Sequence, residues 1–140
     1  MAYWGLSYHS LDSANRLIVP ARFRDGLGNE IVIYRAIEGC LFLYDQARFN
    51  EIAAQLDAYS LDAARREMAR MFFSDVSAVS VDRTGRIVLP AECIEHAGIK
   101  TEVALLGANK RVELWDKETL EAKVADKDSL PASAYPEIEL

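Results

Sequence analysis

Ser10-Leu11-Asp12-Ser13-Ala14-Asn15-Arg16-Leu17-Ile18-Val19-Pro20-Ala21 is a sequence that this chain uses twice. Seventy residues later it reads Ser80-Val81-Asp82-Arg83-Thr84-Gly85-Arg86-Ile87-Val88-Leu89-Pro90-Ala91. The serine, aspartate, arginine, proline and alanine are identical at matched positions, and four further pairs exchange one aliphatic residue for another. Each copy has an aspartate, then an arginine four places on, then a proline four places after that. This spacing indicates a turn that holds a functional side chain. The sequence therefore predicts one structural unit present in two copies.

The middle of each copy predicts a tight turn followed by a short strand. The aspartate side chain can accept hydrogen bonds from backbone amides just after it. Asn15 and Gly85 occupy the same place, and asparagine and glycine are the residues best suited to a positive φ. Both turns are therefore expected to share one geometry. The apolar runs 17–19 and 87–89 that follow predict short, fully buried strands.

The remaining segments of the two copies also correspond. Pro20 and Pro90 suit the start of a helix, and Gly28 and Gly98 suit its end, so short helices are expected over 21–27 and 91–97. Strands are expected over 3–11, 30–34, 41–45, 102–106 and 112–116, and longer helices over 46–58 and 117–126. Between the copies, apolar residues at helical spacing predict a linker helix over about 62–73.

These elements predict an α+β protein that is mainly β. Each copy is too small to bury a core alone, so we expect a single β-barrel-like core shared by two internal repeats about a pseudo-two-fold axis. The expected organisation is a first repeat with its helix, a linker helix, a second repeat with its helix, and a flexible acidic tail, over residues 1–58, 59–79, 80–126 and 127–140. The two repeats are expected to form one structural domain.

The charge of the chain is acidic overall but uneven. The formal net charge is −6, which argues against a generic nucleic-acid binder. Residues 10–24, however, carry Arg16, Arg22 and Arg24 against Asp12, a local charge of +2. Residues 125–140 carry one lysine against four acidic side chains, a local charge of −3. Local charge rather than net charge is therefore what bears on a partner.

Several function classes have no support in the sequence. No apolar run approaches the roughly 20 residues that span a bilayer, and the N-terminus has no signal-peptide pattern, so we expect no membrane partner and a cytoplasmic location. Cys40, Cys93, His9 and His96 stand singly, which predicts buried free thiols and no metal site. A phosphate loop and a nucleophile elbow are both missing from the sequence, so we expect no enzyme, no cofactor and no small-molecule substrate.

The motifs resemble those of the MraZ family of bacterial transcriptional regulators. The resemblance covers about residues 1–125 and rests on three motifs: His9-x-Leu11-Asp12-x-x-x-Arg16-Leu17-x-x-Pro20-x-x-Phe23-Arg24, Asp82-x-x-Gly85-Arg86-Ile87-x-x-Pro90, and Glu113-Leu114-Trp115. It implies a swapped-hairpin barrel of the AbrB type and a ring-shaped homo-oligomer. It also implies a nucleoid-associated protein that binds double-stranded DNA at direct repeats upstream of its own operon, in the division and cell-wall gene cluster.

Two roles are open for the aspartate–arginine pair that is present in both turns. The arginines can contact phosphates or guanine edges, since a guanidinium donates in a planar fork. Alternatively, each aspartate–arginine pair is an internal ion pair that only fastens its turn, and the two roles are compatible. The predicted DNA-binding residues are Asn15, Arg16, Arg22, Arg24, Arg83 and Arg86, with Asp12 and Asp82 orienting the turns.

The first turn is the expected DNA reader, because Arg22 and Arg24 follow it whereas Glu92 and Ile94 follow the second. An alternative function is an AbrB-like protein-interaction module, such as an antitoxin-type partner. Such antitoxins carry one hairpin copy and a disordered inhibitory tail, whereas this chain has two copies and a short tail.

Overall fold

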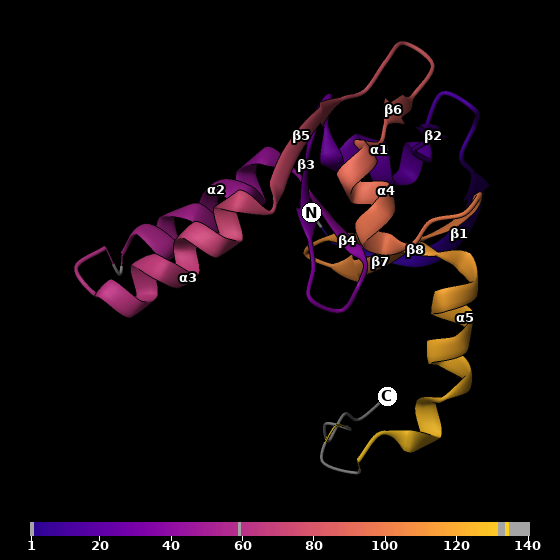
Figure 1. The fold of residues 1–140 in the computed structure, drawn as a ribbon. Helices are drawn as coiled ribbons and strands as arrows, with labels where there is room; N and C mark the ends of the chain where they lie inside the picture. Colours follow the sequence, from indigo (N-terminus) through magenta and orange to yellow (C-terminus); the bar gives the residue numbers. More distant parts are fainter. Residues whose placement is uncertain (1, 59, 132–133, 135–140) are drawn as a thin grey trace.

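The computed structural model describes residues 2–58, 60–131 and 134. Within them the chain is a mixed α+β protein, mainly of strands, with eight strands and five α-helices (Figure 1). The strands are β1 (Tyr3–Ser10), β2 (Arg16–Ile18), β3 (Glu30–Arg35), β4 (Leu41–Tyr44), β5 (Val76–Ser80), β6 (Arg86–Val88), β7 (Glu102–Asn109) and β8 (Val112–Asp116). The helices are α1 (Ala21–Leu27), α2 (Gln46–Asp57), α3 (Ala63–Ser74), α4 (Ala91–Ala97) and α5 (Lys117–Ala125), followed by the 3-10 turn η1 (Lys127–Ser129).

The strands form one large sheet and one small ribbon. The large sheet is antiparallel in the order β1-β7-β8-β4-β3-β5, and the ribbon pairs β2 with β6. The strand pairing leaves β1 and β5 at the two ends of the large sheet, so the sheet is not closed. The mainly-β prediction is confirmed, whereas the closed barrel and the symmetry of two repeats stay predictions.

The main core lies between the ribbon and one face of the large sheet. Leu17 of β2 and Ile87 of β6 are cross-strand partners and are 0% and 1% exposed. They pack with side chains from both copies, including Phe23 of α1 and Leu105 of β7. Because each copy supplies half of this cluster, neither copy could bury it alone.

A second apolar cluster lies around Phe42, Tyr44 and Trp115. It contains a buried carboxylate, that of Glu113, which accepts a hydrogen bond from Trp115 Nε1 at 3.0 Å. Arg111 donates to the same carboxylate through Nε and Nη2 at 2.9 and 2.7 Å, and its guanidinium lies 4.1 Å from the centre of the Phe42 ring. Glu113 is buried because these donors satisfy its charge.

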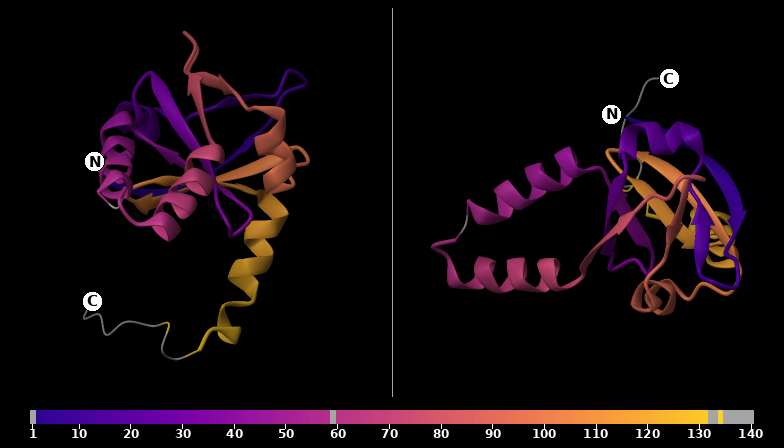
Figure 2. Two further views of the ribbon diagram at one scale, coloured as in Figure 1. Left: turned by 60° about the vertical axis from the view of Figure 1, so that its left-hand side comes forward. Right: turned by 90° about the horizontal axis from the view of Figure 1, so that it is seen from above.

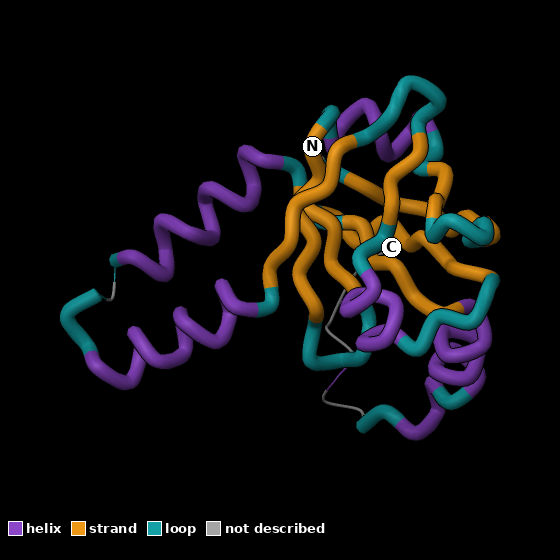
Figure 3. Tube along the Cα trace, turned by 45° about the horizontal axis from the view of Figure 1, so that its top comes forward, coloured by secondary structure: helices purple, strands orange, loops and turns teal. Residues whose placement is uncertain are grey.

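Helices α2 and α3 form a hairpin that projects from the sheets (Figures 1 and 2). Asp45 caps α2 by accepting from the Arg48 amide at 2.8 Å, and Asp62 caps α3 by accepting from the Arg65 amide at 3.1 Å. Neither helix contains a buried residue. Figure 3 shows the same separation, with the strands gathered on one side and the two helices extending from them.

Most predicted elements are confirmed within one or two residues. Helices α1 and α4 have the predicted bounds, and each follows a proline at its N-cap. The segment 59–79, predicted as a linker helix, contains α3 and then strand β5, which pairs with β3. Most of the tail predicted over 127–140 lies outside the described residues.

Candidate nucleic-acid interface

The first turn is organised by the Asp12 carboxylate. Its Oδ1 accepts hydrogen bonds from the backbone amides of Ala14 at 2.9 Å and Arg16 at 2.8 Å. Its Oδ2 accepts from Arg16 Nε, also at 2.8 Å. Asn15, between them, has a φ of 61°, the left-handed conformation that its side chain tolerates. One carboxylate thus shapes the backbone and orients the guanidinium.

The second turn repeats this arrangement. Asp82 Oδ1 accepts from the amides of Thr84 at 2.9 Å and Arg86 at 3.0 Å, and Oδ2 accepts from Arg86 Nε at 3.2 Å. Thr84 adds a bond from its hydroxyl at 2.8 Å. Gly85 has a φ of 80°, so the prediction that both turns share one geometry is confirmed.

The two ion pairs leave the ends of both guanidiniums unused. Within the part of the chain that the structure describes, the side chains of Arg16 and Arg86 form hydrogen bonds to protein only through Nε. The side chains of Arg16 and Arg86 are 40% and 31% exposed. The aspartate therefore fixes each guanidinium by one edge and leaves its two terminal amino groups available to a partner.

The ribbon places both arginines on one surface. Antiparallel pairing sets Arg16 opposite Val88 and Ile18 opposite Arg86, on either side of the buried Leu17–Ile87 pair. Ile18 and Val88 are 50% and 55% exposed. The prediction that these strands are fully buried is therefore wrong, because only one face of a two-stranded ribbon packs on the core. Sequence reasoning missed Ile18 and Val88, although their alternation with Leu17 and Ile87 is the available signal.

Hydrogen bonds within each turn lower the pKa of its aspartate. Hydrogen bonds from the Arg16 amide, then the Arg16 side chain and the Ala14 amide, lower the pKa of Asp12. The pKa of Asp82 is lowered to about 2, first by the Arg86 amide and then by the Thr84 hydroxyl. A carboxylate that accepts several N–H and O–H bonds is stabilised in its charged form.

The other predicted arginines lie in different surroundings. The guanidinium of Arg22 lies 4.7 Å from the centre of the Phe23 ring, on the exposed side of α1. Arg83 is exposed at the second turn. Arg24 is partly buried, donates from Nη1 to the Val19 carbonyl at 2.9 Å, and packs against Gly85. Although Arg24 follows the first turn in the sequence, it lies against the second.

The two cysteine thiols of the chain are buried. Cys40 and Cys93 are buried and free, as predicted. Burial, and then the nearby Glu113 carboxylate, raise the pKa of Cys40 to about 12. Among the described residues, no group of three or more histidine, cysteine, aspartate or glutamate side chains is placed to hold a metal ion. In that same part of the chain, no helix is long and apolar enough to span a membrane.

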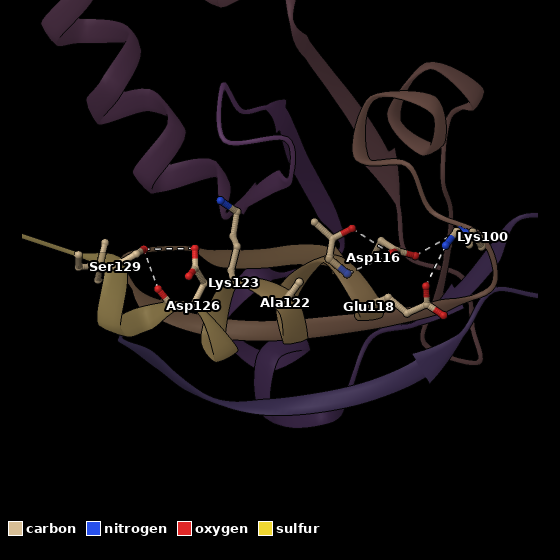
Figure 4. Close-up of a pocket in the computed structure, with 9 residues that line it drawn as sticks. Lys100, Asp116, Glu118, Ala122, Lys123, Asp126 and Ser129 are labelled. Atoms are coloured by element: carbon tan, nitrogen blue, oxygen red, sulfur yellow. Dashed lines mark hydrogen bonds and ion pairs between the residues drawn. The ribbon is translucent and has the colours of Figure 1, made fainter.

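A groove of about 760 Å³ lies beside α5 (Figure 4). Charged side chains of the groove have partners within the protein: Lys100 pairs with Glu118 at 2.8 Å, and Asp116 accepts from the Thr119 amide at 3.3 Å. Asp126 accepts from Ser129 Oγ. Asp116 and Asp126 lie at the two ends of α5, so their contacts stabilise this helix.

Comparison with known proteins identifies the family. A family model described as "MraZ protein, putative antitoxin-like" matches residues 3–71 and again residues 72–137. This chain belongs to the MraZ family. The two matches meet between residues 71 and 72, inside α3, so each match contains one of the two turns.

Relatives that are 34% to 39% identical to this chain align with most of its length. A protein of Acetivibrio thermocellus named Transcriptional regulator MraZ is 34% identical over 127 residues, which are 90% of this chain and 89% of the relative. A protein of the same name from Desulforamulus reducens is 39% identical over 117 residues, 83% and 82% of the two chains. Another from Pelotomaculum thermopropionicum is 34% identical over 137 residues, 97% and 92% of the two chains.

Proposed function

We propose that this chain is a sequence-specific DNA-binding transcriptional regulator that acts on tandem repeats upstream of its own operon, in a division and cell-wall gene cluster. The observation that carries the proposal is the β2–β6 ribbon, which holds the partly exposed side chains of Arg16 and Arg86 on one surface. The names of the relatives, transcriptional regulators, support the same function.

The ribbon has the shape and chemistry for a DNA major groove. The major groove admits a two-stranded β-ribbon, and an arginine fork can bond the O6 and N7 atoms of guanine. Ile18 and Val88, half exposed beside the arginines, suit contact with thymine methyl groups. Asn15, Arg83 and Arg22 lie on the surface around the ribbon and would hold the phosphate backbone.

The order of the strands supports a pseudo-two-fold axis through the ribbon. Exchanging β1–β4 with β5–β8 turns the sheet order β1-β7-β8-β4-β3-β5 into its own reverse. Bonds across the ribbon also come in matched pairs: the Val19 amide donates to the Gly85 carbonyl, and the Leu89 amide donates to the Asn15 carbonyl, both at 2.9 Å. This interlocking supports a swapped-hairpin, AbrB-like barrel shared by the two repeats.

An acidic chain with few arginines needs several linked sites to bind DNA tightly. A ring of identical subunits that faces repeated DNA boxes gains this avidity without any new contact. The exposed apolar side chains support self-association. They lie on the hairpin at Leu61, Met68, Met71 and Phe73, and on β1 at Trp4, Leu6 and Tyr8. Contact between two unlike surfaces is heterologous, which generates rings when the rotation closes.

The proposal is tested by gel shift on the chain's own upstream region at several salt concentrations. We expect wild type to bind with a steep salt dependence, and the double variant Arg16→Ala/Arg86→Ala to lose binding while light scattering shows unchanged assembly. Arg70→Ala is the matched control, because Arg70 is an exposed hairpin arginine paired with Glu67. If the double variant binds as tightly as this control, the ribbon is not the DNA reader.

The antitoxin-like wording of the family description supports one alternative, a protein-interaction module. A pull-down decides between the two functions. Recovery of one stoichiometric protein, together with no binding to the upstream DNA, would favour the alternative.

A further inference from the structure

Arg24 differs from the other arginines of the site because its guanidinium is turned inward. Nη1 donates to the carbonyl of Val19, the residue that follows strand β2. The amide of Val19 in turn donates to the carbonyl of Gly85, at the tip of the second turn. Arg24 therefore links helix α1 of the first copy to the turn of the second copy through one backbone residue.

The contact between Arg24 and Gly85 depends on the absence of a side chain at position 85. A Cβ there would collide with Arg24 Nη1 and would lie 2.9 Å from Cζ. The other turn has a different pair at the matched positions, Asn15 in place of Gly85 and Ile94 in place of Arg24. The first turn thus adopts its backbone geometry with asparagine and isoleucine at these positions, and the second turn does so with glycine and arginine.

We propose that Arg24 is a positioning residue for the second turn: it holds the tip of that turn so that Arg86 is presented to DNA, and it makes no phosphate contact itself. This inference rests on the proposed DNA-binding function.

The surroundings of Arg24 favour positioning over phosphate binding. The groove next to it, of about 490 Å³, is lined by the carboxylates of Asp25 and Asp82 as well as by Arg83. A phosphate entering this groove would meet two negative charges. The exposed guanidinium of Arg83 is the better phosphate donor at this turn.

Hydrogen exchange of two backbone amides tests, without DNA, whether Arg24 holds the second turn in place. In Arg24→Ile, we expect the Val19 amide to exchange about tenfold faster or more, because the second turn loosens. The Leu89 amide, which makes the equivalent bond to Asn15, serves as the internal control and is expected to stay unchanged. Equal acceleration of both amides, or of neither, would overturn the inference.

The double variant Arg24→Ile/Gly85→Asn gives the second turn the isoleucine and asparagine that the first turn has at the matched positions. We expect it to restore slow exchange at Val19 and to recover most of the DNA affinity that Arg24→Ile loses. If Arg24→Ile does not fold, this double variant decides alone. Failure of the double variant to restore Val19 protection would contradict the proposed role.

The salt dependence of DNA binding separates a positioning residue from a phosphate contact. Removing a phosphate contact lowers the slope of log K against log salt by about 0.9 per contact. We expect Arg24→Ile to weaken binding at an unchanged slope, and Arg83→Ala to lower the slope. A lowered slope in Arg24→Ile would overturn the inference. If wild type binds no DNA, the proposed function fails, and amide exchange still decides what Arg24 does.

Discussion

The two turns make the same hydrogen bonds but are supported differently. Asp12 and Asp82 each hold two backbone amides and one guanidinium edge. Behind the second turn stands Arg24, which comes from the first copy. In an interlocked fold, the residues that follow a turn in the sequence can thus support the other turn. Local charge along the chain is then a poor guide to local charge in space.

The largest expected effect concerns the buried core to which both copies contribute. Leu17→Ala and Ile87→Ala should each lower the free energy of unfolding by about 2–5 kcal/mol, because both side chains are fully buried partners at the centre of the ribbon. Urea denaturation measures this. Ile18→Ala, on the outer face, is the control and should cost far less. A large difference between the two buried variants would show that the copies do not share one core equally.

The next effect concerns the outer face of the β2–β6 ribbon, where Arg16 and Arg86 lie. Arg16→Ala and Arg86→Ala should each weaken DNA binding by about 1–3 kcal/mol, or about fivefold to 150-fold, because each removes one guanidinium fork from the same ribbon face. Fluorescence anisotropy with a duplex containing the upstream repeats measures both. Similar losses would mean that the turns act as one surface. If only one variant loses affinity, a single turn reads the DNA.

A smaller effect concerns the aspartates that cap α2, α3 and α5, of which those at α2 and α5 make further buried contacts. Asp45→Ala should cost about 1–2 kcal/mol of stability, because Asp45 caps α2 and also accepts from the hydroxyl of Tyr3, which is 3% exposed. Asp116→Ala should cost a similar amount, since Asp116 caps α5 and is buried. The control is Asp62→Ala at the exposed cap of α3, which should cost less. Equal losses in all three would show that the buried contacts add nothing to capping.

The repeated turn was predictable because its chemistry is local. An aspartate that bonds amides two and four places on, with a positive φ between them, requires no information from elsewhere in the chain. The short helices were predictable for the same reason, since proline and glycine mark their ends. The family was recognisable from these same local motifs.

What the sequence did not reveal depends on contacts between distant segments. The partial exposure of Ile18 and Val88 follows from the pairing of β2 with β6, which local apolar character does not specify. The place of Arg24 against the second turn follows from the interlocking of the copies. Glu113 is acceptable in a buried strand only because Arg111 and Trp115 reach it.

The smallest effect is a difference in acidity between the two turns. Thr84 donates its hydroxyl to Asp82, whereas the matched residue of the first turn, Ala14, has no hydroxyl. Asp82, with a pKa of about 2 against an ordinary value of 3.8, contributes stability that is present above about pH 4 and is lost as the pH falls toward 2. We expect the Asp82 carboxyl carbon to titrate below that of Asp12 in a carbon-detected NMR titration.

Substitution of Thr84 tests whether its hydroxyl causes the difference in pKa between Asp82 and Asp12. In Thr84→Ala, the Asp82 midpoint should rise toward that of Asp12, since the second turn then has the donors of the first and no others. The Asp12 midpoint is the internal control and should not move. An Asp82 midpoint that stays low would mean that the threonine hydroxyl does not cause the difference in acidity between the turns, because the arginine amide and guanidinium bonds are common to both.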